Sequence, residues 1–398
     1  MNVILPNKNK KLGILGDGQL AQMLVEAAFE LGYDPLVYSS SKEHPASLKT
    51  SRIFLGEMKD AEKMSDFFSQ VDLVAFENEF LDCELLGEAS KNLSVQIYPR
   101  LPVIEHLQDK LNQKYLFKTL QMPSSDFVVL NGKDTATLAK LFRNFPEGFV
   151  LKWSRMGYDG KGVLILPAGS KAFDEISRFI ELGFSRGAEV YAEEKINYVT
   201  ELALVATRSI SGKFVSYPLM ISEQENGICK KVFGPAVAFG IPESLQKQAT
   251  TLALKFANSL EMVGTFAMEF FFTREGDLLL NEVAPRVHNS GHITQDAFAP
   301  SQFENHWKAL LDRDLSLKNK APFFGMLNLL GPASAKIQNA KAPEFKEEKL
   351  FLHWYDKKEL RAFRKMGHIN GVADTKNELL EKMKLAQKLD EDWMKSFK

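Results

Sequence analysis

The sequence has little cysteine, almost no net charge and no long apolar run, and each of these shortages argues against a class of protein. Its two cysteines, Cys83 and Cys229, lie far apart in a chain of 398 residues. A disulfide framework or a cysteine-based zinc site is therefore not expected, and both thiols are predicted to be reduced, buried and structural. A formal net charge of −1 gives no overall attraction to nucleic acid or to an anionic membrane.

The apolar stretches are short. The first residues, MNVILPNKNKKLGIL, contain too brief an apolar run for a signal peptide, and no run approaches the length of a membrane span. We therefore expect a cytoplasmic protein. Hydrophobic residues make up 45% and charged residues 25% of the chain, as in ordinary globular proteins. At this length the chain is expected to form two or three domains.

Alternating patterns predict a fold that is α/β at the start and α+β afterwards. In the first hundred residues, apolar runs and a helical pattern alternate, which predicts a small parallel sheet covered by helices. Residues 105–120 read as one helix, and a β-rich tail ends in a helix from about residue 376. Strands are expected at residues 11–15, 35–38, 72–77, 127–130, 149–153, 163–166, 190–193, 201–208, 214–221, 264–273 and 278–283.

The hairpin formed by residues 264–283 carries a pair of carboxylates. If the chain turns around Glu275 and Gly276, Thr273 pairs with Leu278, and Glu269 then lies opposite Glu282. The Cβ atoms of such a pair lie about 5 Å apart, and two carboxylates that close in an apolar sheet need a cation or a shared proton. Oxygen ligands favour a hard ion, and Mg²⁺ commonly bridges such a pair to nucleotide phosphates. The alternative is a shifted register that leaves one glutamate in solvent.

A possible phosphate site follows the strand 149–153. Lys152 lies near the end of that strand, and the loop RMGYDGKG (155–162) adds Arg155, Lys161 and three glycines. A lysine at a strand end can contact phosphate, and glycines let backbone amides approach it. A surface hairpin with incidental charge explains the same residues.

Two further stretches are ambiguous. GILGDGQLA (13–21) resembles a dinucleotide fingerprint, but no acidic residue ends the second strand, where Ser39, Ser40 and Ser41 stand instead. The loop could also bind a substrate phosphate at its helix N-terminus, or be a tight turn. The segment 353–368 carries five basic residues, which form either a solvated face or a phosphate clamp.

Taken together, Lys152, GYDGKG (157–162), EEKI (193–196), the two glutamates and NEVAPRVHNSGH (281–292) resemble the ATP-grasp superfamily. APRVHNSGH, GYDGKG and RKMGH (364–368) are similar to the N5-carboxyaminoimidazole ribonucleotide synthetase family over nearly the whole chain. The resemblance implies a Rossmann-like pre-ATP-grasp domain (1–104), an ATP-grasp domain (105–313) and a small β-rich C-terminal domain (314–398).

The family's activity is ATP- and bicarbonate-dependent carboxylation of 5-aminoimidazole ribonucleotide through carboxyphosphate, in purine synthesis. The resemblance implies ATP and Mg²⁺, a homodimer, a functional link to a mutase, and no nucleic acid or membrane partner. It also implies the following residue roles. ATP would contact Lys110, Lys152, Glu193, Glu194, Lys195, Ile196, Glu201, Asn281 and Glu282, and Mg²⁺ would contact Glu269 and Glu282. The ribonucleotide would contact Gln19, Glu77, Tyr158, Asp159, Arg286, His288, Asn289, Ser290, Lys357 and Arg364, of which Tyr158, Asp159, Arg286 and His288 would be catalytic.

The chain departs from the family pattern in a few places. Asp17 and Gln22 replace a glycine and an arginine, Lys110 replaces an arginine, and Met156 replaces a glycine. Residues 361–365 lack a usual Pro-Gly turn, and residues 77–80 read Glu-Asn-Glu-Phe instead of Glu-Phe-Glu-Asn. None of these changes removes a predicted metal ligand or Lys152.

Three other functions compete with the carboxylase. A formate-using glycinamide ribonucleotide transformylase would share the ATP site but not RVHNSGH. An NADP-linked oxidoreductase would use GDGQLA, yet the sequence offers no hydride-transfer site and its paired carboxylates suit Mg²⁺ better. A non-catalytic nucleotide-binding module would have no need for every phosphate and metal group to be present.

Overall fold

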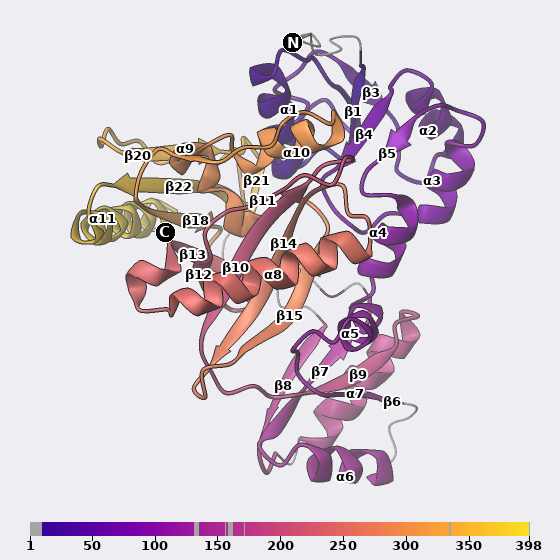
Figure 1. The fold of residues 1–398 in the computed structure, drawn as a ribbon, viewed down its shortest axis with the longest axis vertical. Coiled ribbons are helices and arrows are strands. Elements are labelled where there is room, and N and C mark those ends of the chain that lie inside the picture. The colour runs from indigo at the N-terminus through magenta and orange to yellow at the C-terminus, as the bar shows by residue number, and fades with distance from the viewer. Residues whose placement is uncertain are drawn as a thin grey trace.

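The computed structural model describes residues 10–130, 135–155, 157, 162–170, 172–333 and 336–397. Figure 1 shows an N-terminal α/β body, a small body of strands and helices at the opposite end, and a large sheet between them. The parallel strands at the start, the antiparallel ones in the middle and the β-rich tail confirm the predicted fold class. No helix in the described ranges is both long and apolar enough to cross a membrane.

The N-terminal body is a five-stranded parallel sheet in the order β3-β2-β1-β4-β5. Its buried strands are apolar runs, and its helices cover both faces with the core clusters around Leu24 and Phe67. The elements are β1 (Leu12–Leu15), α1 (Gln19–Glu30), β2 (Leu36–Ser39), β3 (Ile53–Leu55), α2 (Ala61–Phe68), β4 (Leu73–Phe76), α3 (Cys83–Ala89), β5 (Gln96–Ile97) and α4 (Leu101–Leu107).

The small body at the far end has a four-stranded antiparallel sheet in the order β6-β9-β7-β8. We call it the lid sheet. Its core is the cluster that contains Phe149, Leu151, Trp153 and Ile180. Its elements are β6 (Phe127–Leu130), α6 (Thr135–Asn144), β7 (Gly148–Trp153), β8 (Val163–Pro167), α7 (Phe173–Ser185) and β9 (Val190–Glu194), and α5 (Lys110–Thr119) precedes it.

One nine-stranded sheet joins the middle of the chain to its tail, in the order β15-β14-β10-β12-β13-β18-β22-β20 with β11 beside β10. Strand β18 pairs with β13, so the tail continues the same sheet. The elements are β10 (Tyr198–Arg208), β11 (Phe214–Ser216), β12 (Met220–Glu225), β13 (Ile228–Gly234), α8 (Glu243–Ser259), β14 (Gly264–Thr273), β15 (Leu278–Ala284), α9 (Thr294–Ala297), α10 (Gln302–Leu310), β18 (Phe323–Leu330), β20 (Leu350–Trp354), β22 (Lys365–Ala373) and α11 (Lys376–Lys395).

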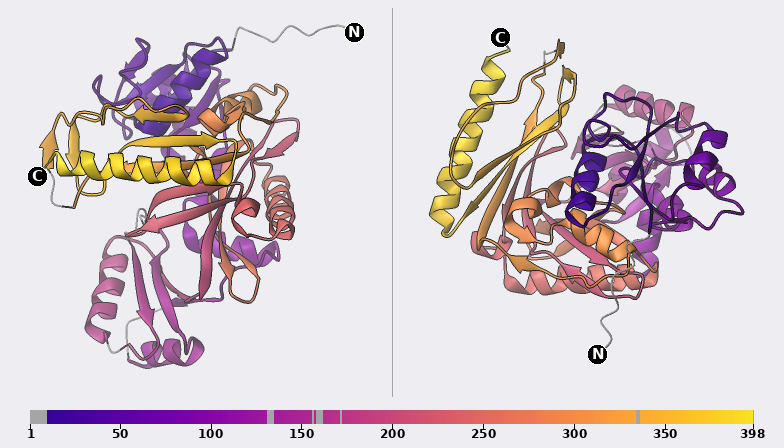
Figure 2. Two further views of the ribbon diagram at one scale, coloured as in Figure 1. Left: turned by 90° about the vertical axis from the view of Figure 1, so that its left-hand side faces the viewer. Right: turned by 90° about the horizontal axis from the view of Figure 1, so that it is seen from above.

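Short elements complete this part, and α11 covers one face of the tail strands (Figure 2). The helix packs there through Leu379, Met383 and Trp393 against Leu327 and Ile369. The short elements are the strand pairs β16 (Phe298–Ala299) with β17 (Lys318–Asn319) and β19 (Lys336–Gln338) with β21 (Glu359–Arg361), and the 3-10 turns η1 (Ala236–Phe239) and η2 (Asn289–Gly291).

Two elements that were predicted as continuous are each divided in two in the structure. The helix expected over residues 105–120 is two helices, because Asp109 accepts the backbone N–H groups of Leu111 and Asn112 and so begins α5 as its N-cap. The strand expected over residues 214–221 is broken between β11 and β12. Pro218 lies in the gap and has no N–H to donate to a ladder.

The predicted hairpin has the expected carboxylate pair but a different register near its turn. Phe272 pairs with Leu278, so the expected pairing of Thr273 with Leu278 is wrong. An irregularity at Asn281 inserts one extra residue, and beyond it Glu269 lies opposite Glu282 as predicted. The bulge therefore cancels the shift of one residue that arises at the turn.

Candidate functional site

A cleft of about 1010 Å³ lies between the N-terminal body, the lid sheet and the nine-stranded sheet. It brings together most of the residues that the sequence singled out. Its lining includes Gln19, Glu77, Lys110, Lys152, Glu193, Glu194, Lys195, Ile196, Glu201, Glu269, Asn281, Glu282, Arg286, His288 and Asn289.

Of the predicted site residues that the structure describes, three do not line this cleft. Tyr158 and Asp159 lie outside the described residues. Ser290 is fully buried, and its hydroxyl lies 2.8 Å from Nδ1 of His288, so it supports that ring from behind. Lys357 lies between β20 and β21, and Arg364 lies in the turn between β21 and β22.

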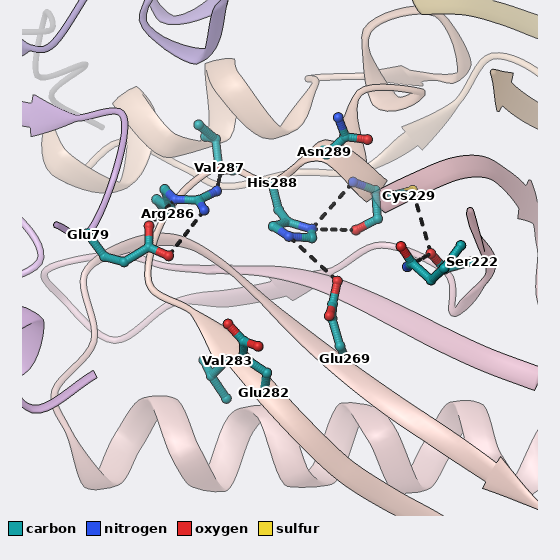
Figure 3. A network of polar contacts seen from close by, with 12 residues as sticks. Glu79, Ser222, Cys229, Glu269, Glu282, Val283, Arg286, Val287, His288 and Asn289 are labelled. Carbon is teal, nitrogen blue, oxygen red and sulfur yellow. Dashed lines mark hydrogen bonds and ion pairs between the residues drawn. The ribbon is translucent and has the colours of Figure 1, made fainter. Parts of the chain in front are cut away.

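Glu269 on β14 and Glu282 on β15 form the acidic centre of the cleft. Figure 3 shows both carboxylates pointing toward the side where Arg286 and His288 lie. Burial, then Glu282 and Glu201, raise the pKa of Glu269 to about 7. Two carboxylates that share a buried site repel each other when both are ionised, and a bound divalent cation relieves this repulsion.

Helix α5 supplies a cation and a clamp to this acidic pair. Lys110, its first residue, forms an ion pair with Glu282. Burial alone lowers the pKa of Lys110, but Glu282 outweighs it and raises the pKa above its usual value. Gln113, one turn later, accepts the N–H of Val283 at 2.9 Å and donates to the Val283 carbonyl at 3.0 Å. These bonds fix the backbone of β15 beside Glu282.

A second cationic group lies where the lid sheet meets β15. The Nζ of Lys152 on β7 donates to Glu193 on β9 and to Asn281, both at 3.1 Å. Behind it, the buried Lys114 donates to Ser125 at 2.9 Å, and Ser125 donates to Glu193 at 3.0 Å. Burial lowers the pKa of Lys114 to about 8. The Glu193 side chain therefore pairs with the two lysines, and the next residues of the chain line the cleft.

Burial raises the pKa of Glu193 by itself, but Lys152 and Lys114 more than offset this effect, and the pKa lies below its usual value. Glu193 is consequently the ionised counter-charge of two lysines. The backbone N–H of Glu194 donates to the Asp126 carbonyl, and that of Lys195 to the Gly148 carbonyl. These bonds hold residues 193–196 as an ordered strand end at the cleft.

Glu201 on β10 also lines the cleft. Its carboxylate accepts the hydroxyl of Tyr198 at 3.1 Å. Burial raises its pKa. Apolar side chains from both sheets face each other around this end of the cleft: Val150, Val163, Ile165, Ile196 and Phe271. This end suits a flat apolar ring with a hydroxylated group beside it.

His288 follows β15 and is held tightly through its backbone. Its N–H donates to Gln302 Oε1 at 2.9 Å, and Gln302 Nε2 donates to its carbonyl at 2.7 Å. Its Nε2 lies 3.6 Å from Glu269. Burial, then Arg286 and Lys365, lower the pKa of His288 well below its usual value. The imidazole is consequently neutral at physiological pH.

Arg286 forms a paired contact with Glu79, which lies in the loop after β4 of the N-terminal body (Figure 3). Nε of Arg286 donates to Glu79 Oε2, and Nη2 donates to Oε1 at 3.2 Å. Glu79 and the rest of its acidic surroundings raise the pKa of Arg286 against the effect of burial. The pKa of Glu79 is lowered, because Arg286 outweighs the opposing effect of burial. Both groups are charged.

The glycine loop before α1 does not offer its amides to a dinucleotide. The carboxylate of Glu77 accepts the N–H groups of Gly18 at 3.0 Å and Ala21 at 3.3 Å. Asp17 accepts hydrogen bonds from Ser39 at 2.7 Å and from the Ser40 N–H at 3.1 Å. The Glu77 carboxylate therefore takes amides that the fingerprint would offer to a pyrophosphate, and a dinucleotide reading of GDGQLA is wrong.

The basic segment before β22 folds back toward the cleft. Lys357 Nζ donates to the Lys365 carbonyl at 2.7 Å and lies near enough to Glu77 to lower the pKa of that carboxyl, which burial chiefly raises. Arg364 donates to the Glu359 carbonyl at 2.8 Å. Lys365, which the sequence reading did not select, lines the cleft itself.

The donor set fits a hard divalent cation that is completed by a phosphate. Glu269 and Glu282 supply carboxylate oxygens, and Asn281 between them supplies an amide oxygen. Within the described ranges, no group of three or more histidine, cysteine, aspartate or glutamate side chains could hold a metal ion. A cation here needs oxygen ligands from a bound phosphate, as Mg²⁺ usually has.

Sequence reasoning missed Glu79 and Lys365, which both line the cleft. A signal existed for Glu79, since the motif Glu77-Asn78-Glu79 has two carboxylates after a buried strand. Cys229 also lines the cleft, and both cysteines are free. Cys229 is buried as predicted, whereas Cys83 is partly exposed.

Comparison with known protein families gives three matches along the chain. A ribonucleotide synthetase preATP-grasp domain matches residues 9–108, and an ATP-grasp domain matches residues 115–303. A phosphoribosylaminoimidazole carboxylase C-terminal domain matches residues 325–382. Together these matches cover most of the chain in one order.

Individual relatives resemble the chain over nearly its whole length. The N5-carboxyaminoimidazole ribonucleotide synthase of Synechococcus elongatus is 34% identical over 402 residues, which cover 97% of this chain and 96% of that protein. The carboxyaminoimidazole ribonucleotide synthase of Aspergillus clavatus with ATP has a TM-score of 0.85 at 28% identity, over 97% of this chain and 99% of that one. The Aspergillus clavatus enzyme with ADP and 5-aminoimidazole ribonucleotide has a TM-score of 0.84 at 27% identity, over 96% and 99%.

Proposed function

This chain belongs to the N5-carboxyaminoimidazole ribonucleotide synthase family of ATP-grasp ligases, and from that premise we propose how its residues divide the reaction among them. The activity is the ATP-dependent carboxylation of 5-aminoimidazole ribonucleotide in purine biosynthesis. The observation that carries the residue assignment is the meeting of Lys152, the Glu269–Glu282 pair, Arg286 and His288 in one cleft.

ATP occupies the part of the cleft between the lid sheet and β14. Its adenine lies among Val163, Ile165 and Phe271 and against the backbone of residues 193–196, and its ribose lies near Glu201. Lys152 and Lys110 contact its phosphates as compact positive charges. Lys152 already stands between Glu193 and Asn281, so it is positioned before the nucleotide arrives.

Glu269 and Glu282 would hold Mg²⁺ together with the phosphates of ATP. When bound, it neutralises charge that develops on the transferred phosphoryl group. Lys110 now pairs with Glu282, so in the loaded site it shares that carboxylate or turns toward a phosphate. The raised pKa of Glu269 supports this assignment, because the carboxyl is poised to lose its proton as a cation binds.

The ribonucleotide lies between the N-terminal body and the tail. Glu77 and Gln19 line the cleft on one side. Lys357, between β20 and β21, and Arg364, in the turn before β22, clamp the 5′-phosphate. This assignment is supported by the position of the basic segment, which the tail folds back onto the N-terminal body. Lys358 of that segment pairs there with Glu43 at 2.6 Å. Tyr158 and Asp159, outside the described residues, keep the roles predicted from the sequence.

Bicarbonate binds at Arg286 and His288, next to the phosphates. An oxygen of bicarbonate attacks the γ-phosphorus, the bond to ADP breaks, and carboxyphosphate forms. It separates into CO₂ and phosphate, and the amine of the ribonucleotide forms the new C–N bond to CO₂ as its proton leaves. Arg286 offsets the anionic charge, and the neutral His288 offers a hydrogen bond without competing as a cation. Asn289 and the buried Ser290 complete this wall.

Two partner assignments rest on the family resemblance and are part of the same proposal. The protein forms a homodimer, and its product passes to a mutase that rearranges the carboxylate. Sedimentation of the purified protein would reveal the first. Co-assay with the mutase, with the labile product measured in solution, would test the second.

The assay that tests the function measures ADP release with Mg-ATP and bicarbonate, with and without 5-aminoimidazole ribonucleotide. We expect strong stimulation by the ribonucleotide and incorporation of ¹⁴C from bicarbonate into an acid-labile product. Glycinamide ribonucleotide with formate serves as the comparison acceptor pair. Turnover with that pair, or turnover independent of bicarbonate, would contradict the proposal.

A further inference from the structure

Glu79 reaches across from the N-terminal body to the residue that we assign to bicarbonate. The two residues are 207 positions apart in the sequence, and only 8% of Glu79 is exposed. Glu79 sits in the short loop after β4, whereas Arg286 follows β15 of the large sheet. The contact is thus a buried ion pair between two bodies, at the wall of the cleft (Figure 3).

The hydrogen bonds of Arg286 use the Nε–Nη2 edge of its guanidinium and one N–H of Nη1. This group carries five N–H donors in a fixed planar fork. Nε and one N–H of Nη2 go to Glu79, and one N–H of Nη1 goes to the Val287 carbonyl at 3.2 Å. Within the part of the chain that the structure describes, one N–H remains on each of the adjacent nitrogens Nη1 and Nη2.

The surroundings of Arg286 explain why one edge must be fixed. Glu282 and Glu77 also attract its charge. Without a carboxylate at position 79, the guanidinium could turn toward Glu282, which is one of the metal-binding pair. Such a turn would bring a fixed cation to the place of Mg²⁺ and take the remaining donors away from the substrate anion.

We propose that Glu79 is a positioning residue for carboxylation: it holds the Nε–Nη2 edge of Arg286 so that the remaining Nη1 and Nη2 donors receive bicarbonate. This inference rests on the proposed function, which places bicarbonate at Arg286. Glu79 itself does not touch the substrate. Two parallel donors recognise a planar carboxylate-like anion with defined orientation, and this orientation directs an oxygen toward the γ-phosphate.

The experiment compares the full-length protein with Glu79→Gln and Glu79→Asp, in steady-state assays that vary bicarbonate and ATP separately. For Glu79→Gln we expect the KM for bicarbonate to rise about tenfold or more, since a charge-assisted bidentate contact is lost. The KM for ATP should change less than about twofold. Glu79→Asp keeps the charge and should recover most of the bicarbonate KM.

A matched control separates positioning from simple attachment of the N-terminal body. Glu261 pairs with Arg100 at 3.6 Å, also between that body and the large sheet, but on the exposed surface and away from Arg286. Glu261→Gln should leave both KM values unchanged. Urea unfolding of each variant shows whether it is folded under the assay conditions.

Three outcomes would overturn the inference. An unchanged bicarbonate KM in folded Glu79→Gln would leave Glu79 a structural role only. A lower bicarbonate KM would show that Glu79 competes with bicarbonate for Arg286. Equal rises in the KM values for ATP and bicarbonate would indicate general damage to the cleft. Arg286→Lys, which keeps the charge but not the fork, tests the premise: an unchanged bicarbonate KM there would contradict the assignment of bicarbonate to Arg286 itself.

Discussion

At the scale of single residues, the Glu269 carboxyl connects cation binding to the stability of the fold. Its pKa is raised from 4.5 to about 7, first by burial and then by Glu282. The folded protein consequently binds this proton more tightly than the unfolded chain does. Stability without metal is unaffected by this group below pH 4.5, falls between pH 4.5 and about 7, and stays reduced above that range.

We predict that Glu269→Gln is inactive but more stable than the natural protein at pH 8 when Mg²⁺ and nucleotide are absent. The neutral amide removes the cost of ionising a buried carboxyl, an effect on the order of 1–3 kcal/mol. ATP turnover should fall at least about 100-fold, because the substitution removes a carboxylate that we propose as a ligand of Mg²⁺.

Urea unfolding at pH 5 and pH 8 measures this difference. At pH 5 the variant and the natural protein should have nearly equal stability, which serves as the internal control. A variant that is no more stable at pH 8 would argue against a raised Glu269 pKa, and near-normal turnover would rule out the metal assignment.

The basic turn before β22 gives a second test at this scale. Arg364→Ala should raise the KM for the ribonucleotide roughly tenfold, since a charged phosphate contact contributes about 1.5–3 kcal/mol. The KM for ATP should not change. Lys346→Ala, at an exposed position of the tail, is the charge-matched control. A ribonucleotide KM that responds to Lys365→Ala but not to Arg364→Ala would move the clamp to Lys365.

Single site residues could be predicted from the sequence where a motif identified them. They were harder to predict where the direction of the side chain decides whether it lines the cleft. Lys152 and the paired glutamates were found because strand pairing places them. Arg364 and Lys365 are adjacent and both basic, so the sequence does not say which of them lines the cleft. In the structure β22 begins at Lys365, and Lys365 lines the cleft. Glu79 was missed because the partner of a buried arginine lies 207 residues away.

At the scale of elements, the N-terminus of α5 matters most for the nucleotide. Asp109 accepts the N–H groups of Leu111 and Asn112 at 2.9 and 3.0 Å, and it pairs with Arg155 at 2.9 Å. Lys110 follows directly. The cap therefore fixes the start of α5, where Lys110 lies, and ties this helix end to the loop after β7.

We predict that Asp109→Ala destabilises the protein by about 1 kcal/mol or more through the lost cap and raises the KM for ATP severalfold. Asp109→Asn keeps an oxygen for the cap but not the charge toward Arg155, so it should retain most of the stability. Thermal unfolding and ATP-dependent kinetics measure the two effects. Equal behaviour of the two variants would show that the cap is not what positions Lys110.

Element boundaries show what the sequence could and could not provide. Strands β6 and β14 match their predicted ranges, because apolar runs bounded by polar residues define them. The break between α4 and α5 at Asp109 was not predicted, because the apolar pattern of a helix continues on both sides of it. The bulge at Asn281 could not be predicted from the apolar pattern of one strand, since it arises from the pairing of β14 with β15. The predicted carboxylate pair was correct although the register at the turn was not.

At the scale of the whole molecule, the nine-stranded sheet makes the tail part of the same structure as the ATP site. Residues Lys231–Gly234 of β13 pair with Phe324–Leu327 of β18. Asn328 of β18 also exchanges amide hydrogen bonds with Asn289, at 2.6 and 3.3 Å. The loop that carries His288 is thus held from the tail side.

We predict that a chain ending at residue 322 does not fold into a stable remainder. Its β13 would expose an unpaired edge and the buried side chain of Val232, which favours association with other chains. Size-exclusion chromatography after expression should show aggregates, while the full chain under identical conditions is the control. A monodisperse, nucleotide-binding product would instead support residues 314–398 as an independent domain.

The cleft also has a consequence for the order of events during synthesis. Its walls come from residues between Gly18 and Lys365, and the ribosome releases these in sequence. The N-terminal sheet can close early, since its five strands lie within residues 12–97. The cleft itself takes shape later, because the lid sheet and β14 follow in the sequence, and Asn328 and Lys365 emerge later still. The complete cleft is therefore available only when translation has passed Lys365.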